Sequence, residues 1–148
     1  MIRATHPTYV LDASVAAKWF TPHEEPQREK ALALRALHLS GRTKLAVPEF
    51  ALLEILNAVK YSARAEESDA TKAVELLEKL RLKVVPLDWG LLRKATAIAF
   101  EYRIALYDAA YVALAEQLGF PLLTADEVMT KKMNGHAIVV RLAELEFE

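Results

Sequence analysis

Short runs of consecutive apolar residues alternate along this chain with longer stretches in which apolar residues recur every three or four positions. The first pattern predicts buried β-strands and the second predicts helices with one apolar face. Strands are expected at residues 9–11, 45–47, 83–88, 121–124 and 137–140. Helices are expected at residues 15–20, 27–40, 49–64, 68–82, 89–102, 104–118 and 127–133, with a last helical turn at 142–145. Proline and polar residues at 21–26 predict a loop.

The alternation of strands and helices predicts the fold class. Parallel strands need long crossover connections, which the helices would supply. We therefore expect a three-layer α/β/α fold with a central parallel sheet of about five strands, covered on both faces. The stretch 104–118 is apolar on nearly all sides, which predicts a buried helix. No linker, low-complexity tract or internal repeat divides the chain, so residues 1–148 are expected to form a single domain.

Composition narrows the class of protein. Hydrophobic residues make up 53% of the 148 residues and charged residues 26%, which is typical of a folded globular chain. Cysteine is absent, so disulfides, thiol catalysis and cysteine-ligated zinc are excluded. We find neither a membrane-spanning apolar stretch nor a secretory signal, and we expect a cytoplasmic location. The formal net charge of −1 provides no global basic field, so nucleic-acid binding would depend on local charges.

Four acidic residues fall where a carboxylate is costly to bury. Asp12 follows the first predicted strand and Asp126 the fourth. Asp108 stands near the start of the buried helix, and Glu54 lies within an otherwise apolar helical stretch. Each has an ordinary explanation, the aspartates as helix N-caps and Glu54 as the partner of an arginine. Together they favour a shared site, because a carboxylate beside a core is unfavourable unless it is paired, hydrogen-bonded or metal-bound.

Such a site would lie at the carboxyl edge of the parallel sheet, where ligands bind in this fold class. Clustered carboxylates repel one another, so the cluster predicts bound cations, and oxygen donors select Mg²⁺ or Mn²⁺ over zinc. These ions activate water and stabilise the leaving alkoxide in phosphodiester hydrolysis. Ser14 and Thr124 each lie two residues from an aspartate of the set, as supporting hydroxyls or as simple turn residues. Asn57 shares a helix face with Glu54.

The ordered set of acidic motifs resembles that of the PIN-domain ribonucleases, in particular the VapC-type toxins of prokaryotic toxin–antitoxin pairs. The motifs are Val10–Ser14, Glu54 with Asn57, Tyr107–Ala109 and Leu123–Asp126, within a resemblance that extends from Tyr9 to about Arg141. The resemblance implies a Mg²⁺- or Mn²⁺-dependent endoribonuclease, an RNA substrate, a homodimer and a small antitoxin partner. It also implies a catalytic and metal-binding quartet of Asp12, Glu54, Asp108 and Asp126, supported by Ser14, Asn57 and Thr124.

Other residues carry weaker signals. Asp88 follows the third predicted strand and is expected to cap the next helix, because the acidic set is complete without it. Lys18, Lys131 and Lys132 flank the proposed site in sequence, as phosphate contacts or as ordinary surface lysines. The aromatic residues expected in the core or in an interface are Trp19, Trp89, Tyr107 and Tyr111.

Two other functions fit parts of the pattern. A phosphotransfer domain of receiver or aspartyl-phosphatase type also places an aspartate at a strand end beside Mg²⁺. Ser14, however, occupies the position where such a phosphatase would carry its second aspartate. A non-catalytic interaction module, in which the acidic residues cap helices and form ion pairs, is the remaining alternative.

Overall fold

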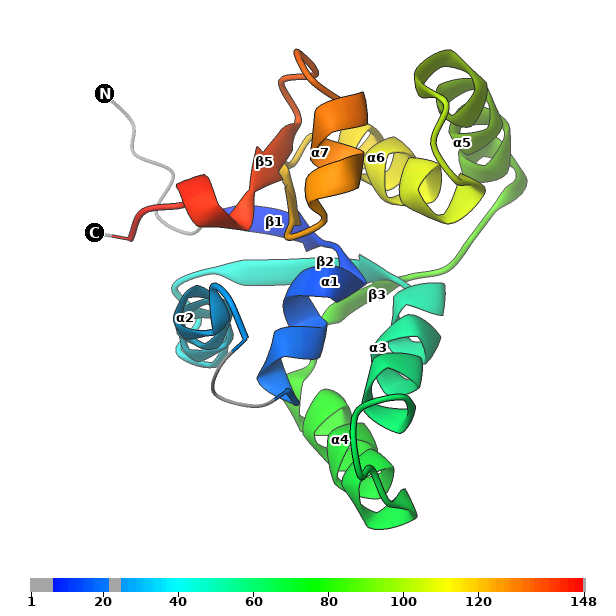
Figure 1. The fold of residues 1–148 in the computed structure, drawn as a ribbon. Coiled ribbons are helices and arrows are strands. Elements are labelled where there is room, and N and C mark those ends of the chain that lie inside the picture. Colours follow the sequence, from blue (N-terminus) through cyan, green and yellow to red (C-terminus); the bar gives the residue numbers. More distant parts are fainter. Residues whose placement is uncertain (1–6, 22–24, 148) are drawn as a thin grey trace.

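Residues 7–21 and 25–147, which the computed structural model describes, fold around a sheet of five parallel strands (Figure 1). The strands lie in the order β3-β2-β1-β4-β5, with every neighbouring pair parallel. Their bounds are β1 Thr8–Leu11, β2 Lys44–Pro48, β3 Lys83–Val85, β4 Leu122–Thr124 and β5 Val139–Arg141. The predicted parallel sheet is confirmed, and β1 lies at its centre.

Helices cover both faces of this sheet. They are α1 Ala13–Ala16, α2 Arg28–Leu39, α3 Phe50–Lys60, α4 Glu67–Leu80, α5 Trp89–Tyr102, α6 Leu106–Leu118 and α7 Glu127–Lys132. Two 3₁₀ turns, η1 Ala17–Trp19 and η2 Leu142–Glu144, complete the described elements. Figure 1 shows α5 and α6 on one side of the sheet and α1 and α2 on the other. The predicted three-layer α/β/α architecture is therefore confirmed.

The core lies between α6 and the central strands. Residues 109–115 of α6 are all buried, and four of these seven are alanines. Small side chains allow a helix to approach a sheet closely, which accounts for the contacts of α6 with β1, β2 and β4. The apolar residues of β1 and β4 that face this core are completely buried, as expected for strands covered on both faces.

Two element boundaries differ clearly from the predictions. The helix predicted over 49–64 ends at Lys60, and Arg64 adopts a φ of 60°, which a right-handed helix excludes. The strand predicted over 83–88 ends at Val85 because the next residue, Pro86, has no N–H to continue the ladder. The other bounds lie within two residues of their predictions. Residues 22–24 of the predicted loop lie outside the described residues.

Asp88 begins α5 as predicted. Its Oδ1 accepts a hydrogen bond from the backbone N–H of Leu91 at 2.7 Å, which makes it a genuine N-cap. Asp88 is thus explained by its helix.

None of the helices within residues 7–21 and 25–147 is both long enough and apolar enough to cross a membrane.

Candidate active site

The carboxyl ends of β1 and β4 lie side by side. Their register pairs Leu11 with Leu123, and the backbone N–H of Asp12 donates to the Leu123 carbonyl at 3.0 Å. Asp12, the first residue after β1, therefore meets Thr124, the last residue of β4. This places the first and fourth strand ends at one edge of the sheet, as the sequence predicts.

Two hydroxyl groups hold the Asp12 carboxylate. Its Oδ2 accepts hydrogen bonds from Ser14 Oγ at 2.5 Å and from Thr124 Oγ1 at 2.8 Å. Each hydroxyl is itself fixed by backbone: Ala125 N–H donates to Ser14 Oγ and Asp126 N–H donates to Thr124 Oγ1, both at 3.0 Å. The β1–α1 turn and the β4–α7 turn are thus joined through one carboxylate oxygen.

Asp12 does not cap the helix that follows it. Its side chain makes no cap hydrogen bond to α1, so that alternative from the sequence is wrong for this residue. The side chain is only 6% exposed. Burial raises its pKa above the usual value and the charge of Asp126 raises it further, while the hydrogen bonds from Ser14 and Thr124 lower it. A buried carboxylate with two hydroxyl partners is costly unless something else stabilises its charge.

Glu54 reaches the same edge from α3 and is held by a tyrosine. The Tyr111 hydroxyl donates to Glu54 Oε1 at 2.7 Å, and the hydroxyl oxygen of Tyr111 accepts the backbone N–H of Ala13 at 3.3 Å. Burial and the charge of Asp12 raise the pKa of Glu54, against the lowering effect of the Tyr111 hydrogen bond. Glu54 therefore pairs with Tyr111 and not with the arginine that the sequence suggests. The sequence predicts Tyr111 only as a core or interface aromatic.

Replacing Tyr111 by phenylalanine tests this bridge. The change leaves the Ala13 N–H and Glu54 Oε1 without their shared partner, so we expect the free energy of unfolding to fall by about 1–3 kcal/mol. Tyr107→Phe is the control: its ring is largely exposed, and we expect a change within about 0.5 kcal/mol. Urea denaturation measures both. Equal stability of Tyr111→Phe and wild type would show that the bridge contributes nothing.

Asp108 lies in the first turn of α6, where Ala105 is the N-cap residue, so the cap explanation is wrong for it. Burial and the charges of Asp12, Asp126 and Glu54 together raise the pKa of Asp108 from 3.8 to about 6, against a lowering effect of Lys132. Three carboxylates therefore act on the fourth. The four acidic residues predicted from the sequence therefore lie close enough for three of them to raise the pKa of the fourth.

Asp126 both caps a helix and acts on the other carboxylates of the quartet. Its Oδ1 accepts the N–H of Met129 at 3.0 Å, so it is the N-cap of α7. The cap explanation is correct for this residue, yet its charge also raises the pKa values of Asp12 and Asp108.

The chemistry of the quartet fits a hard cation. Within the described residues, no three histidine, aspartate or glutamate side chains meet closely enough to form a ready-made metal site. Charges within the quartet nevertheless raise the pKa values of Asp12, Glu54 and Asp108, and the donor atoms of the quartet are all oxygens. Such a set suits Mg²⁺ or Mn²⁺, and ligation would require the side chains to move together.

The remaining candidates lie at the margins of the site. Asn57 occupies an exposed position on α3, and Lys131 and Lys132 are exposed in the last turn of α7. Lys18 is only 7% exposed, so it is not an ordinary surface lysine.

The predicted aromatic residues divide into two groups. Trp19 and Tyr111 are buried, as predicted for core aromatics. Trp89 is 76% exposed and Tyr107 is also exposed, so neither belongs to the core, and for both the predicted alternative of an interface position stays a prediction.

Comparison with known proteins places this geometry in a family. The family model described as PIN domain matches residues 9–133. The chain belongs to the PIN-domain family. It is 33% identical over 127 residues to Ribonuclease VapC3 of Pyrobaculum aerophilum, covering 83% of this chain and 92% of the relative. It is 31% identical over 109 residues to Exonuclease VapC9 of the same organism, covering 71% of this chain and 82% of that relative.

A solved structure has the same fold as this chain. The structure titled a toxin-antitoxin complex from Klebsiella pneumoniae superimposes with a TM-score of 0.68 at 17% identity, covering 93% of this chain and 99% of that one. The resemblance to PIN domains and VapC toxins inferred from the acidic motifs is therefore confirmed.

Proposed function

We propose that this PIN-domain protein is a Mg²⁺- or Mn²⁺-dependent endoribonuclease that hydrolyses RNA phosphodiester bonds, and the toxin of a toxin–antitoxin pair. The observation that carries the proposal is the raised pKa of Asp12, Glu54 and Asp108 at the carboxyl edge of the sheet, to which burial and the charges of neighbouring carboxylates, Asp126 among them, contribute. The names of the two Pyrobaculum relatives, a ribonuclease and an exonuclease, support a nuclease. We propose that this site belongs to a single domain of residues 1–148.

The quartet of Asp12, Glu54, Asp108 and Asp126 would hold the ion or ions. A bound divalent cation would polarise a phosphodiester oxygen and strengthen water as a nucleophile. Because one oxygen of Asp12 and one of Asp126 are already hydrogen-bonded, we assign the second oxygen of each to the ligand.

The supporting residues orient the donors. Ser14 and Thr124 prevent the Asp12 carboxylate from rotating, and Tyr111 does the same for Glu54. Asn57 lies one helical turn from Glu54 on α3, and we assign it to the rim that faces RNA.

Metal removal tests the proposal directly. We expect purified protein to cleave single-stranded RNA at internal positions with Mg²⁺ or Mn²⁺, and to stop when the ions are chelated by EDTA. Gel analysis of end-labelled RNA separates internal cuts from loss of terminal nucleotides. Ladders made only of successive terminal losses would point to an exonuclease instead, and a complete lack of cleavage with either ion would favour a non-catalytic module.

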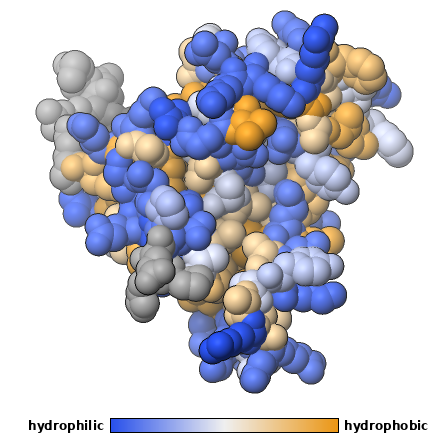
Figure 2. Space-filling view, viewed as in Figure 1, coloured by the Kyte–Doolittle hydropathy of each residue, from blue (hydrophilic) through white to orange (hydrophobic). Residues whose placement is uncertain are grey.

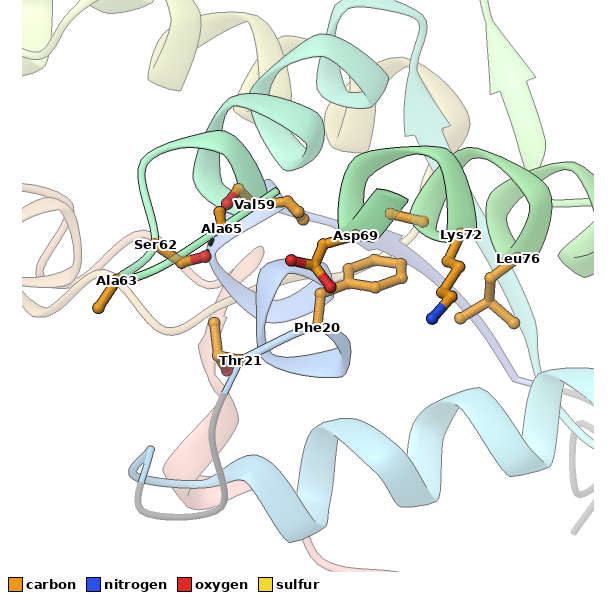
Figure 3. Close-up of a pocket in the computed structure, with 10 residues that line it drawn as sticks. Phe20, Thr21, Val59, Ser62, Ala63, Ala65, Asp69, Lys72 and Leu76 are labelled. Carbon is orange, nitrogen blue, oxygen red and sulfur yellow. Dashed lines mark hydrogen bonds between the residues drawn. The ribbon is translucent and has the colours of Figure 1, made fainter. Parts of the chain in front are cut away.

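An antitoxin partner has a suitable cleft on this chain. A hollow of about 490 Å³ lies between η1, α3 and α4, with Phe20, Val59 and Leu76 among its apolar walls. Figure 3 shows the Phe20 ring pointing toward α4, with Asp69 and Lys72 beside it. We assign this cleft to an apolar segment of an antitoxin, as the toxin–antitoxin complex among the structural relatives supports. Loss of antitoxin binding in Phe20→Asp, measured by calorimetry, tests the assignment.

A homodimer would cover the exposed face of α5. Trp89 and Phe100 are 76% and 80% exposed and lie eleven residues apart, which places them on one side of the helix. Figure 2 shows hydrophobic side chains gathered at the upper right, over α5. We propose that a second copy packs here. Sedimentation of wild type against Phe100→Lys would show whether this face joins two copies.

A further inference from the structure

A second charged pocket opens along the same edge of the sheet as the acidic quartet. Arg141 ends β5 and is paired in register with Thr124, whose hydroxyl holds Asp12. The pocket has a volume of about 370 Å³. Its walls include the cations of Lys18 and Arg141, the carboxylates of Glu25 and Glu127 that pair with them, and Ala125. Because neighbouring strands lie about 4.8 Å apart, the end of β5 is on the order of 10 Å from the end of β1. The pocket thus adjoins the proposed catalytic edge. None of the residues that line it belongs to the acidic quartet.

The Arg141 guanidinium is held only loosely by glutamates. Its Nη2 lies 3.0 Å from Glu127 Oε1 and its Nη1 lies 3.3 Å from Glu144 Oε1. Both glutamates are exposed, and exposed ion pairs contribute little to stability. Within the described part of the chain, the buried Nε of Arg141 has no hydrogen-bond partner. The guanidinium therefore has an unfilled donor and two partners that another anion can replace.

Lys18 brings a second cation to this pocket. Its side chain is largely buried, and its Nζ donates to Glu25 Oε1 at 3.3 Å, where the glutamate is partly exposed. A buried ammonium that relies on a partly solvated carboxylate is not fully compensated. Lys18 therefore adds to the attraction of the pocket for an anion.

An RNA strand needs cations beside the proposed catalytic site. The acidic quartet repels the phosphates that flank the scissile bond, and the net charge of −1 offers no global attraction. The planar fork of arginine matches phosphate geometry, and phosphate contacts position a strand on its protein. On this basis we propose that the Lys18–Arg141 pocket binds an RNA phosphate next to the one cleaved, Arg141 exchanging Glu144 for the phosphate. The inference rests on the proposed ribonuclease function.

The salt dependence of RNA binding tests the pocket without any cleavage. The probe is a fluorescein-labelled single-stranded oligoribonucleotide of mixed sequence, bound to full-length protein in EDTA. Losing one phosphate contact lowers the slope of log K against log salt by about 0.7 for a single strand. We expect this reduction in Arg141→Gln, together with a roughly threefold or greater loss of affinity at low salt. Arg141→Lys should keep most of the slope because it keeps the charge.

Two further variants separate a phosphate site from a structural arginine. Glu144→Gln releases Arg141, so we expect RNA to bind roughly two- to fivefold more tightly. Lys83→Gln removes a cation from β3, at the opposite edge of the sheet, and should leave the slope unchanged. Three results would each overturn the proposed phosphate site: an unchanged slope of log K against log salt in Arg141→Gln, weaker RNA binding in Glu144→Gln, or no RNA binding by wild type.

A cleavage assay with Mn²⁺ judges the nuclease separately. If wild type does not cleave RNA but Arg141→Gln still lowers the salt slope of binding, the proposed activity is wrong and the phosphate site is supported. If wild type cleaves RNA but Arg141→Gln leaves the salt slope of binding unchanged, the phosphate site is wrong and the proposed activity is supported.

Discussion

Replacing Asp12 by asparagine is expected to reduce metal-dependent RNA cleavage by roughly 10²- to 10³-fold, the range found when one preorganised electrostatic group is removed from an active site. Asparagine keeps the shape of the side chain and an oxygen that can accept from Ser14 and Thr124. It removes the negative charge that would bind the cation. Because the charge is buried, its loss should not unfold the protein. Initial cleavage rates at saturating Mn²⁺ measure the effect, and circular dichroism checks the fold.

Asp88→Asn provides the matched control for this change. Asp88 is also an aspartate just ahead of a helix, but its side chain serves as the N-cap of α5. Asparagine caps helices about as well as aspartate, so cleavage and stability should both stay near wild type. Wild-type cleavage by Asp12→Asn would remove Asp12 from the catalytic set. Equal losses in both variants would show that the effect is not specific to the site.

Replacing Asp108 by asparagine should stabilise the protein without metal while abolishing cleavage. The pKa of Asp108 is raised from 3.8 to about 6 by burial and by three neighbouring carboxylates. The folded state therefore binds a proton on the Asp108 carboxyl more tightly than the unfolded state does. The protonated carboxyl stabilises the fold fully below pH 3.8, and this stabilisation is lost as the pH rises through about 6. At pH 7 the charged Asp108 destabilises the fold, and its removal should add about 1–2 kcal/mol after allowance for partial exposure.

Thermal unfolding in EDTA across pH 4–8 measures this gain. The difference between Asp108→Asn and wild type should grow from pH 4 to pH 7. Adding Mn²⁺ should then raise the melting temperature of wild type more than that of the variant, because only wild type keeps the full donor set. Glu101→Gln, which changes an exposed acid on α5, should show neither effect. A variant less stable than wild type at pH 7 would contradict the assigned repulsion.

The sequence was informative wherever function coincides with local pattern. Asp12 and Thr124 could be placed at one edge because each ends an apolar run and parallel strands end together. Glu54 was conspicuous because its neighbours on the helix are apolar. In both cases the signal is a polar residue in a setting that ordinarily excludes it, which needs no knowledge of distant contacts.

Long-range partners were beyond this reasoning. Tyr111 is surrounded in sequence by alanines and valine, so the pattern indicates a core aromatic, and its bond to Glu54 spans 57 positions. The available signal was its spacing of three residues from Asp108 on a helix, which places both on one face. The burial of Lys18 could not be predicted either, because its neighbours Glu25 and Arg141 come later in the chain.

The position of β4 has a consequence for how the protein is made. β4 pairs with β1 in the interior of the sheet, although more than a hundred residues separate them along the chain. A ribosome that has released the chain only as far as α5 has delivered Asp12 and Glu54, with one edge of β1 still unpaired. Asp108 and Asp126 emerge later, and only the docking of β4 brings Thr124 onto Asp12. The order of synthesis therefore delays the acidic quartet, whose members can come together only after β4 and Asp126 have left the ribosome.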